Sequence, residues 1–187
     1  MFFGKYLTGA GFARGMKANQ VIEIRKGSIT TMQVHCIVNP ANSFGFMGGG
    51  VAEAIKKIGG QSIEDEAIEQ APIQVGTAII TGAGDLVCQK VIHAPTMHNP
   101  AEKTDTHKVM CAVKAALELA ESEGMLSIAF PGMGTGVGGL DKQEAAKVMV
   151  DTIRKAKLKC VEKIILIDID DDMVAAFEKA MNIKKRS

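Results

Sequence analysis

Two glycine-rich segments carry the clearest chemical signal in this sequence. They run through Gly48-Gly49-Gly50-Val51 and through Gly134-Thr135-Gly136-Val137-Gly138, and each joins an apolar β-type stretch to a stretch of helical pattern. Glycine lets a backbone approach a ligand closely and adopt positive φ, which we expect at Gly49 and Gly136. The first turn of a helix also presents N–H groups that favour an anion. The pair therefore predicts a phosphate-bearing ligand held from two sides.

Other patterns point to chemistry less strongly. The second segment also satisfies G-x-G-x-x-G, but a dinucleotide-binding unit should have its acidic residue about 20 residues on, and Asp168 lies farther away. The acidic run from Asp168 to Asp172 offers oxygen ligands for Mg²⁺, although capping of a helix start explains it better. Cys36 lies in an apolar stretch and is interpreted as a packed thiol. Apart from the loosely placed His98 and His107, the histidines lack metal-ligand spacing, so we predict no metal ion. We also predict no cofactor.

Composition restricts the partners and the compartment. The formal net charge is +1 and aromatic residues make up 4% of the chain, so we expect no nucleic-acid partner and no membrane partner. No apolar run approaches the roughly 20 residues that a membrane helix needs. The cysteines are widely spaced and form no C-x-x-C pair, which favours reduced thiols and a cytoplasmic protein. The sequence leaves the oligomeric state open.

The spacing of apolar residues predicts strands that alternate with helices. Strand patterns cover residues 21–25, 34–39, 75–81, 90–94, 125–130 and 163–167, with a turn at 82–85. Helical patterns cover residues 51–58, 62–70, 106–120, 141–156 and 170–181. Asp141 and Glu144 have the spacing of a helix N-cap and its reciprocal partner. The alternation predicts an α/β fold with three layers, α/β/α, around a mostly parallel or mixed sheet.

The length of the chain suits one domain with its own core. We place this domain at residues 19–183, after an N-terminal extension over residues 1–18 that is loosely tied to it and before a basic tail over residues 184–187. The first fifteen residues are interrupted by glycine and are too short in apolar length for a signal peptide.

The two glycine segments resemble a known family. Val38-Asn39-Pro40-Ala41-Asn42 followed by Gly48-Gly49-Gly50-Val51-Ala52 is similar to the macro domain signature, V-N-A-A-N and then G-G-G-V-A. Ile128 to Gly139 resembles the second loop of that family, I-A-F-P-x-x-x-T-G-V-x-G. The resemblance extends roughly from Val21 to Ala180. It implies a three-layer α/β/α macro domain with a mixed central sheet, and a site for ADP-ribose or an ADP-ribosylated molecule.

The resemblance also implies a role for each site residue. Asn39 would brace the first loop, and Asn42 would reach the distal ribose. Ser28 and Ile29 would lie on the adenine side. The distal ribose and one side of the pyrophosphate would be lined by Gly48, Gly49, Gly50 and Val51. The phosphates would be wrapped by the loop that contains Gly132, Gly134, Thr135, Gly136, Val137 and Gly138.

Three positions depart from the family pattern. Ser28 replaces an aspartate that many members hold against the adenine amine, and a neutral hydroxyl makes the weaker hydrogen bond. Gly138 replaces an aromatic residue over the ribose, so that wall is open or is supplied by Phe44 or Phe46. Ala52 replaces an aspartate that one hydrolytic branch uses.

Two function classes remain open from the sequence. In the first, which we favour, the protein hydrolyses a group from the distal ribose of mono-ADP-ribosyl-protein, O-acetyl-ADP-ribose or ADP-ribose 1″-phosphate, with Asn42 as the catalytic residue. In the second, it is a non-catalytic module that reads ADP-ribosyl groups. A module for poly(A) or RNA ends is a third possibility. No nucleophile with an adjacent base is evident near the loops, so hydrolysis would depend on a positioned water.

Overall fold

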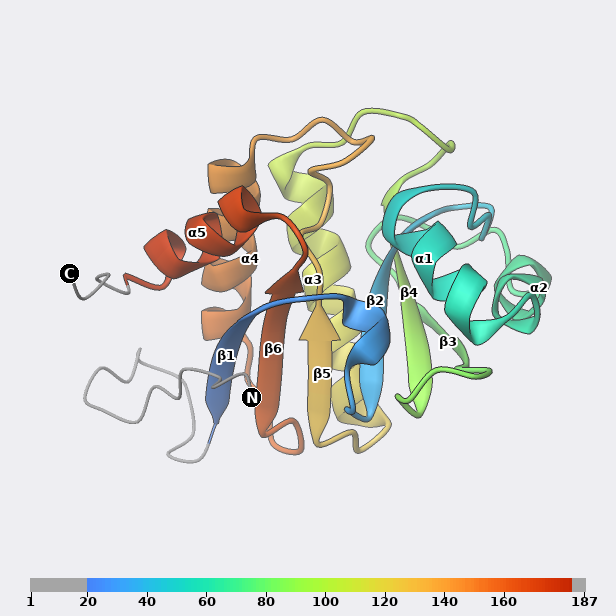
Figure 1. Ribbon diagram of the computed structural model, residues 1–187, viewed down its shortest axis with the longest axis horizontal. Helices are drawn as coiled ribbons and strands as arrows, with labels where there is room; N and C mark the ends of the chain where they lie inside the picture. The colour runs from blue at the N-terminus through green and yellow to red at the C-terminus, as the bar shows by residue number, and fades with distance from the viewer. Residues whose placement is uncertain (1–19, 183–187) are drawn as a thin grey trace.

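The computed structural model describes residues 20–182, which form a six-stranded sheet between two layers of helices (Figure 1). The strands are β1 (Val21–Lys26), β2 (Cys36–Asn42), β3 (Ile79–Gly82), β4 (Lys90–Met97), β5 (Ser127–Phe130) and β6 (Lys163–Asp168). The helices are α1 (Gly50–Gly59), α2 (Ser62–Glu69), α3 (Thr106–Ser122), α4 (Lys142–Lys155) and α5 (Asp171–Ala180), with a short 3₁₀ helix, η1 (Ile29–Thr31). The predicted extension over residues 1–18 and the predicted tail over residues 184–187 lie outside the described residues.

The sheet is mixed, and its order is β1-β6-β5-β2-β4-β3. Every neighbouring pair is parallel except β3 and β4, which are antiparallel. One face carries α1, α2 and η1, and the other carries α3, α4 and α5 (Figure 1). The predicted three-layer α/β/α architecture is therefore confirmed. Strand β2 lies between β5 and β4, and all three run parallel. The segments that follow these strands therefore meet at the carboxyl-terminal end of the sheet.

The course of β2 differs from the predicted strand over residues 34–39. It begins at Cys36 and continues through Pro40 to Asn42, so the asparagines belong to the strand rather than to a turn. Proline cannot donate to a neighbouring strand and normally ends a central strand. Here β2 pairs with β5 only at Cys36 and Ile37, and from Asn39 onward it pairs with β4 alone. Pro40 is tolerated because β2 has become an edge strand at that point.

The strand predicted at residues 75–81 is found as a shorter strand that lies farther along the chain. Strand β3 covers only Ile79–Gly82, with a single bridge between Val75 and Thr77 before it. Gly76 lies between those two residues with φ of +94°, a conformation that interrupts a regular strand. Gly82 belongs to the strand rather than to the predicted turn.

Aspartate side chains begin three of the helices. Asp105 Oδ1 accepts the Lys108 N–H before α3, and Asp141 Oδ1 accepts the Gln143 and Glu144 N–H groups before α4. Asp170 Oδ1 likewise accepts two N–H groups at the start of α5. Each carboxylate satisfies donors that the first turn of a helix leaves free. The acidic run from Asp168 to Asp172 is thus explained by capping, and the described residues contain no cluster of His, Cys, Asp or Glu able to hold a metal ion.

Candidate functional site

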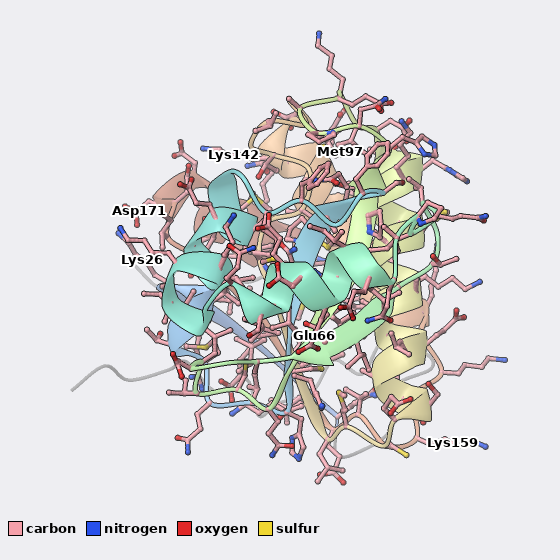
Figure 2. The ribbon with its side chains drawn as sticks, turned by 90° about the vertical axis from the view of Figure 1, so that its right-hand side faces the viewer. Lys26, Glu66, Met97, Lys142, Lys159 and Asp171 are labelled. Carbon is pink, nitrogen blue, oxygen red and sulfur yellow. The ribbon has the colours of Figure 1, made fainter. Side chains whose placement is uncertain are left out.

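The two glycine segments line one cleft at the carboxyl-terminal end of the sheet. Strands β2 and β5 are parallel neighbours, with Cys36 opposite Ile128, so the segments that leave their carboxyl ends lie next to each other. The cleft has a volume of about 310 Å³. It is lined by Pro40, Ala41, Asn42, Phe46, Gly48, Gly49, Gly50, Val51, Ala52, Thr96, Met97, Pro100, Ala101, Gly132, Gly134, Gly136, Val137 and Gly138. Figure 2 shows Met97 at this end of the molecule, together with Lys142 at the start of α4.

The side chain of Asn42 shapes the first loop. Its Nδ2 donates to the Phe46 carbonyl at 2.8 Å, and its Oδ1 accepts the Phe44 N–H at 3.0 Å. The Gly45 N–H also bonds to the Asn42 carbonyl at 3.3 Å. Asn42 is 8% exposed and lines the cleft, so the residue predicted to reach the ribose also fixes the turn around it.

Glu64 of α2 anchors the residue that precedes the first glycines. Its carboxylate accepts hydrogen bonds from the Met47 N–H at 2.6 Å, from Lys56 Nζ at 2.9 Å and from Gln61 Nε2 at 2.7 Å. Burial by itself would raise the pKa of Glu64, but these donors outweigh it and hold the pKa below its ordinary value of 4.5. The first loop is therefore held in place by an ionised carboxylate.

We expect the stability contributed by Glu64 to depend on pH. Because its pKa is lowered in the folded protein, this contribution is complete above about pH 4.5 and is lost as the pH falls through the folded pKa. At neutral pH the free energy of unfolding of the Glu64→Gln variant should be about 1–3 kcal/mol lower than that of the parent, because charge-assisted hydrogen bonds are lost. Thermal unfolding measured from about pH 7 to pH 3 should show the two proteins converging in acid. A constant difference across that range would contradict the assignment.

The second loop is fixed by three hydrogen bonds in which its backbone takes part. The Gly132 N–H donates to Asp168 Oδ2 at 3.0 Å, and the Leu140 N–H donates to the Gly134 carbonyl at 3.0 Å. The Thr104 N–H, from the segment that follows β4, donates to the Gly138 carbonyl at 3.0 Å. These bonds hold the loop against its neighbours and leave its tip facing the cleft.

Both loops contain backbone N–H donors that have no acceptor in the described part of the protein. Within residues 20–182, the N–H groups of Thr135, Gly136 and Val137 donate to no protein acceptor. In α1 the first N–H group to donate within the helix is that of Glu53, which bonds to the Gly49 carbonyl. The N–H groups of residues 50–52 therefore have no acceptor within the helix. No ionisable side chain is among the cleft residues. An anion here would be bound by consecutive main-chain dipoles and the start of a helix.

Comparison with known proteins identifies this arrangement. Residues 38–149 match the model of the macro domain family. The chain belongs to that family. A protein of Aquifex aeolicus is 55% identical over 163 residues, which make up 87% of this chain and 99% of that protein. The O-acetyl-ADP-ribose deacetylase of Klebsiella pneumoniae is 33% identical over 167 residues, or 85% of this chain and 95% of the deacetylase.

Solved structures agree with the family assignment. The Trypanosoma brucei macrodomain in complex with ADP-ribose superposes on this chain with a TM-score of 0.77 and 25% sequence identity. The match covers 86% of this chain and 68% of the trypanosome chain. The resemblance noted in the sequence is thus confirmed for the family and for the fold.

The glycines that adopt positive φ in this macro domain are not the ones predicted to do so. Gly49 has φ of −169°, which is extended backbone open to any residue, and φ is not positive at Gly136 either. Positive φ occurs instead at Gly50, +57°, and at Gly134, +79°. A Cβ atom at Gly49 or Gly136 would meet nothing within 4 Å, so these two glycines leave open space for a ligand. The expectation of positive φ at both positions was wrong.

Gly138 is required by packing inside the loop. A Cβ atom there would lie 2.7 Å from the Gly134 carbonyl oxygen and 2.7 Å from Thr104 Cγ2. The aromatic side chain common at this position in macro domains therefore has no room in this loop conformation. Phe46 lines the cleft from the opposite loop.

Ten of the predicted site residues line the cleft, and four lie outside it. Those in the cleft are Asn42, Gly48, Gly49, Gly50, Val51, Gly132, Gly134, Gly136, Val137 and Gly138. Ser28 caps η1, where its Oγ contacts Thr30 Oγ1 at 2.7 Å, and Ile29 is buried in the core beneath α1. Thr135 faces a separate surface depression next to Leu140 and Asp141.

Asn39 braces the sheet rather than the first loop. Its Nδ2 lies 3.1 Å from His93 Nδ1, and His93 Nε2 lies 2.9 Å from Thr81 Oγ1. Thr81 Oγ1 donates to the Gly82 carbonyl, so it accepts from His93, and the histidine carries its proton on Nε2. Burial lowers the pKa of His93 to about 4, which keeps this chain of polar groups neutral. The predicted bracing of the loop by Asn39 is replaced by a link across β2, β4 and β3.

Several cleft residues were missed at the level of sequence. Thr96, Met97, Pro100 and Ala101 come from the end of β4 and the segment after it. Their positions follow from the pairing of β2 with β4, which places the end of β4 beside the first loop. No motif marks these residues, and only the strand order could have identified them.

Two further expectations concern thiols and membranes. Burial raises the pKa of Cys36 to about 12, so this thiol is a packed core group and not a nucleophile, as predicted. Within residues 20–182, no helix has both the length and the apolar character needed to cross a membrane.

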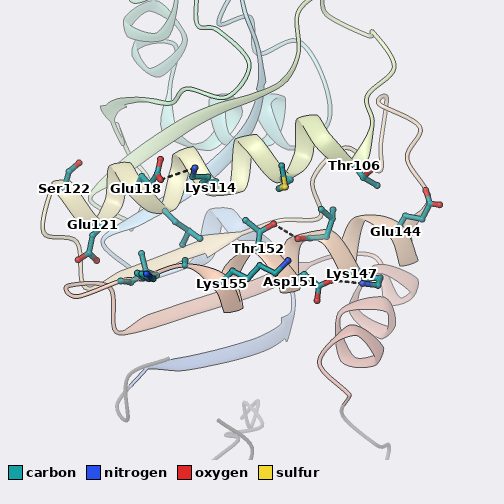
Figure 3. Close-up of a pocket in the computed structure, with 16 residues that line it drawn as sticks. Thr106, Lys114, Glu118, Glu121, Ser122, Glu144, Lys147, Asp151, Thr152 and Lys155 are labelled. Atoms are coloured by element: carbon teal, nitrogen blue, oxygen red, sulfur yellow. Dashed lines mark hydrogen bonds and ion pairs between the residues drawn. The ribbon is translucent and has the colours of Figure 1, made fainter. Parts of the chain in front are cut away.

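A larger groove lies between α3 and α4, with a volume of about 830 Å³ (Figure 3). Its polar rim includes the ion pairs of Lys114 with Glu118 and of Lys147 with Asp151. Acidic and basic side chains alternate there, so the groove concentrates no positive charge for a phosphate. It also lies away from both glycine loops, and we assign the ligand to the smaller cleft.

Proposed function

We propose that the cleft binds ADP-ribose or a derivative of it. The observation that carries this proposal is the pair of backbone stretches that line the cleft from the two loops, residues 50–52 and 136–137, whose N–H groups have no acceptor among the described residues. Two such stretches suit a pyrophosphate, which offers acceptor oxygens on two sides. The macro domain family and the ADP-ribose bound by the trypanosome macrodomain support the same ligand.

In this proposal each loop binds one part of the ligand. The second loop donates its N–H groups to the phosphates, and the start of α1 donates to the pyrophosphate from the other side. The distal ribose lies beside Asn42 and Gly48. The adenine end extends toward η1, where Ser28 offers a hydroxyl that is already engaged with Thr30.

We further propose that the protein hydrolyses a group from the distal ribose. The deacetylase of Klebsiella pneumoniae, at 33% identity, supports O-acetyl-ADP-ribose as one substrate, beside mono-ADP-ribosyl-protein and the 1″-phosphate. No carboxylate, histidine or thiol lines the cleft, so the attacking group is a water held in place by the loop and by the substrate. In the deacetylation, the water oxygen bonds to the acetyl carbon, the ester bond to the ribose breaks, and a proton passes to the ribose oxygen. Positioning and fixed N–H donors accelerate such a step without a strong base, so turnover is slow.

A non-catalytic ADP-ribose reader is the second candidate function. The same absence of ionisable side chains from the cleft favours it, because a reader needs no acid or base. Both functions require ADP-ribose binding. They differ only in whether the bound ligand is hydrolysed.

Calorimetric titration tests the ligand. ADP-ribose should bind at least about 30-fold more tightly than AMP, because AMP lacks the second phosphate and the distal ribose and so forgoes several charge-assisted hydrogen bonds. ADP should fall between the two. Equal affinities for AMP and ADP-ribose would contradict the assignment of the cleft.

Replacement of Asn42 tests turnover. Asn42→Ala removes the amide that bonds to residues 44 and 46, so the loop and the distal ribose lose their fixed geometry. We expect the single-turnover rate on O-acetyl-ADP-ribose and on the 1″-phosphate to fall by about 10- to 100-fold, while ADP-ribose affinity falls far less. A parent protein that binds ADP-ribose tightly and turns over none of the derivatives would be a reader.

A further inference from the structure

Two of the four aromatic residues in the described part of the chain lie on the first loop, and one of them lines the cleft. Phe130 and Phe177 are fully buried in the core, as aromatic residues of a folded domain usually are. Phe44 and Phe46, on the first loop, are 44% and 49% exposed. Burial in the core therefore does not account for these two side chains, although exposed aromatic surface carries a risk of aggregation.

The two rings are held in a fixed arrangement. They are stacked, with centroids 6.0 Å apart and planes 15° from parallel. Their loop is pinned by the bond of the Ser43 N–H to the His98 carbonyl at 3.0 Å and by that of the Ile73 N–H to the Ser43 carbonyl at 2.8 Å. Gly45, between the rings, fits so closely against α2 that a Cβ atom would lie 2.8 Å from the Ala67 carbonyl carbon. The rings are thus pre-oriented before any ligand arrives.

The two rings have different surroundings. Phe46 lines the cleft, whereas Phe44 does not. Phe44 therefore backs Phe46, whose ring contributes to the cleft wall. Val137 lines the cleft from the other loop and is 59% exposed, so the mouth has apolar side chains on both sides. Stacking on an oriented ring binds planar groups without requiring charge.

We propose that Phe46, backed by Phe44, forms a stacking subsite for a planar heteroaromatic ring carried on the distal ribose of the ligand. This inference rests on the proposed function, which places the distal ribose beside Gly48, two residues after Phe46. The cleft would then accept ligands in which ADP-ribose ends in a base. An apolar side chain of a modified protein is the alternative occupant of the same surface. The stacked geometry favours the ring, because a third ring extends an existing stack.

The test compares ligands that differ only in the group on the distal ribose. ADP-ribose carries a hydroxyl there, NAD⁺ carries a positively charged aromatic nicotinamide ring, and NADH carries a neutral dihydronicotinamide ring that is nearly planar but not aromatic. Each is titrated by calorimetry into the full chain and into the variants Phe46→Leu, Phe46→Tyr and Phe44→Leu. The first variant removes the ring at similar volume, the second keeps a ring, and the third removes only its support.

We expect Phe46→Leu to weaken the binding of both nicotinamide dinucleotides by about five- to tenfold and to change ADP-ribose binding less than about twofold. Phe46→Tyr should keep the parent affinities, and Phe44→Leu should cause a smaller loss than Phe46→Leu. An equal loss for all three ligands would show that the ring only walls the ribose, and this inference would then be wrong. Unchanged affinities for the three ligands would overturn it too, as would a loss seen only for an ADP-ribosylated peptide titrated in parallel. If the parent protein failed to bind ADP-ribose, the proposed function itself would fall, and this inference with it.

Discussion

Gly49→Glu should abolish ADP-ribose binding and leave the protein folded. Gly49 is extended, with φ of −169°, and a Cβ atom there meets nothing within 4 Å, so a side chain is accommodated without strain. That side chain enters the space where the pyrophosphate would lie, and its carboxylate repels the phosphates in a cleft that holds no compensating cation. We expect the affinity measured by calorimetry to fall by more than about 100-fold, because the site loses its anion preference.

Two matched variants separate charge from volume. Gly49→Gln has nearly the same shape as Gly49→Glu without its charge, and should lose less affinity. Gly49→Ala adds a single methyl group and should bind ADP-ribose within a few-fold of the parent. Circular dichroism and thermal unfolding should be unchanged in all three. A well-folded Gly49→Glu protein with parental affinity would show that the first loop does not face the phosphates.

Gly134→Ala should lose both stability and binding. Gly134 has φ of +79°, and a Cβ atom there would lie 2.7 Å from Thr104 Cγ2 and 2.9 Å from Val109 Cγ2. The left-handed conformation costs an alanine about 1–2 kcal/mol, and the added methyl group overpacks the base of the loop at a cost of about 1–3 kcal/mol. Denaturant unfolding should therefore show a loss of about 2–5 kcal/mol. Titration should show weaker ADP-ribose binding, because the loop moves away from Thr104.

Gly136→Ala, in the same loop, is the matched control. Its backbone is not in the left-handed region, and a Cβ atom there would meet nothing within 4 Å. Its unfolding free energy should differ from that of the parent by less than about 0.5 kcal/mol, as for surface substitutions generally. Equal stability losses for Gly134→Ala and Gly136→Ala would contradict the loop conformation described above.

The elements that the sequence predicts well are those with a strong local signal. The α3 and α4 patterns repeat over several turns, and an aspartate begins each helix, so their existence and extent could be predicted. Strand β2 was harder, because Pro40 suggests the end of a strand. It is allowed only because the pairing with β5 ends at Ile37, three residues earlier, and no local pattern encodes the reach of a neighbouring strand.

The site shows the same division between local and long-range information. The glycines of both loops could be predicted from their motifs, and at Gly50 and Gly134 the positive φ itself favours glycine. Thr96 and Met97 could not, since their contribution depends on the position of β4 in the sheet. Asn39 shows the converse case. Its place in a recognisable motif suggested a loop contact, whereas its partner is His93, 54 residues farther along the chain.

The absence of ionisable side chains from the cleft has a consequence for how the protein responds to its solvent. A phosphate site built from lysine or arginine attracts its ligand through charges that salt screens, so its affinity falls as salt is added. Main-chain N–H groups carry no net charge, so salt screens their hydrogen bonds to the ligand far less. Ligand affinity in this cleft should accordingly change little between dilute buffer and high ionic strength, and the site would operate alike in cells of very different internal salinity.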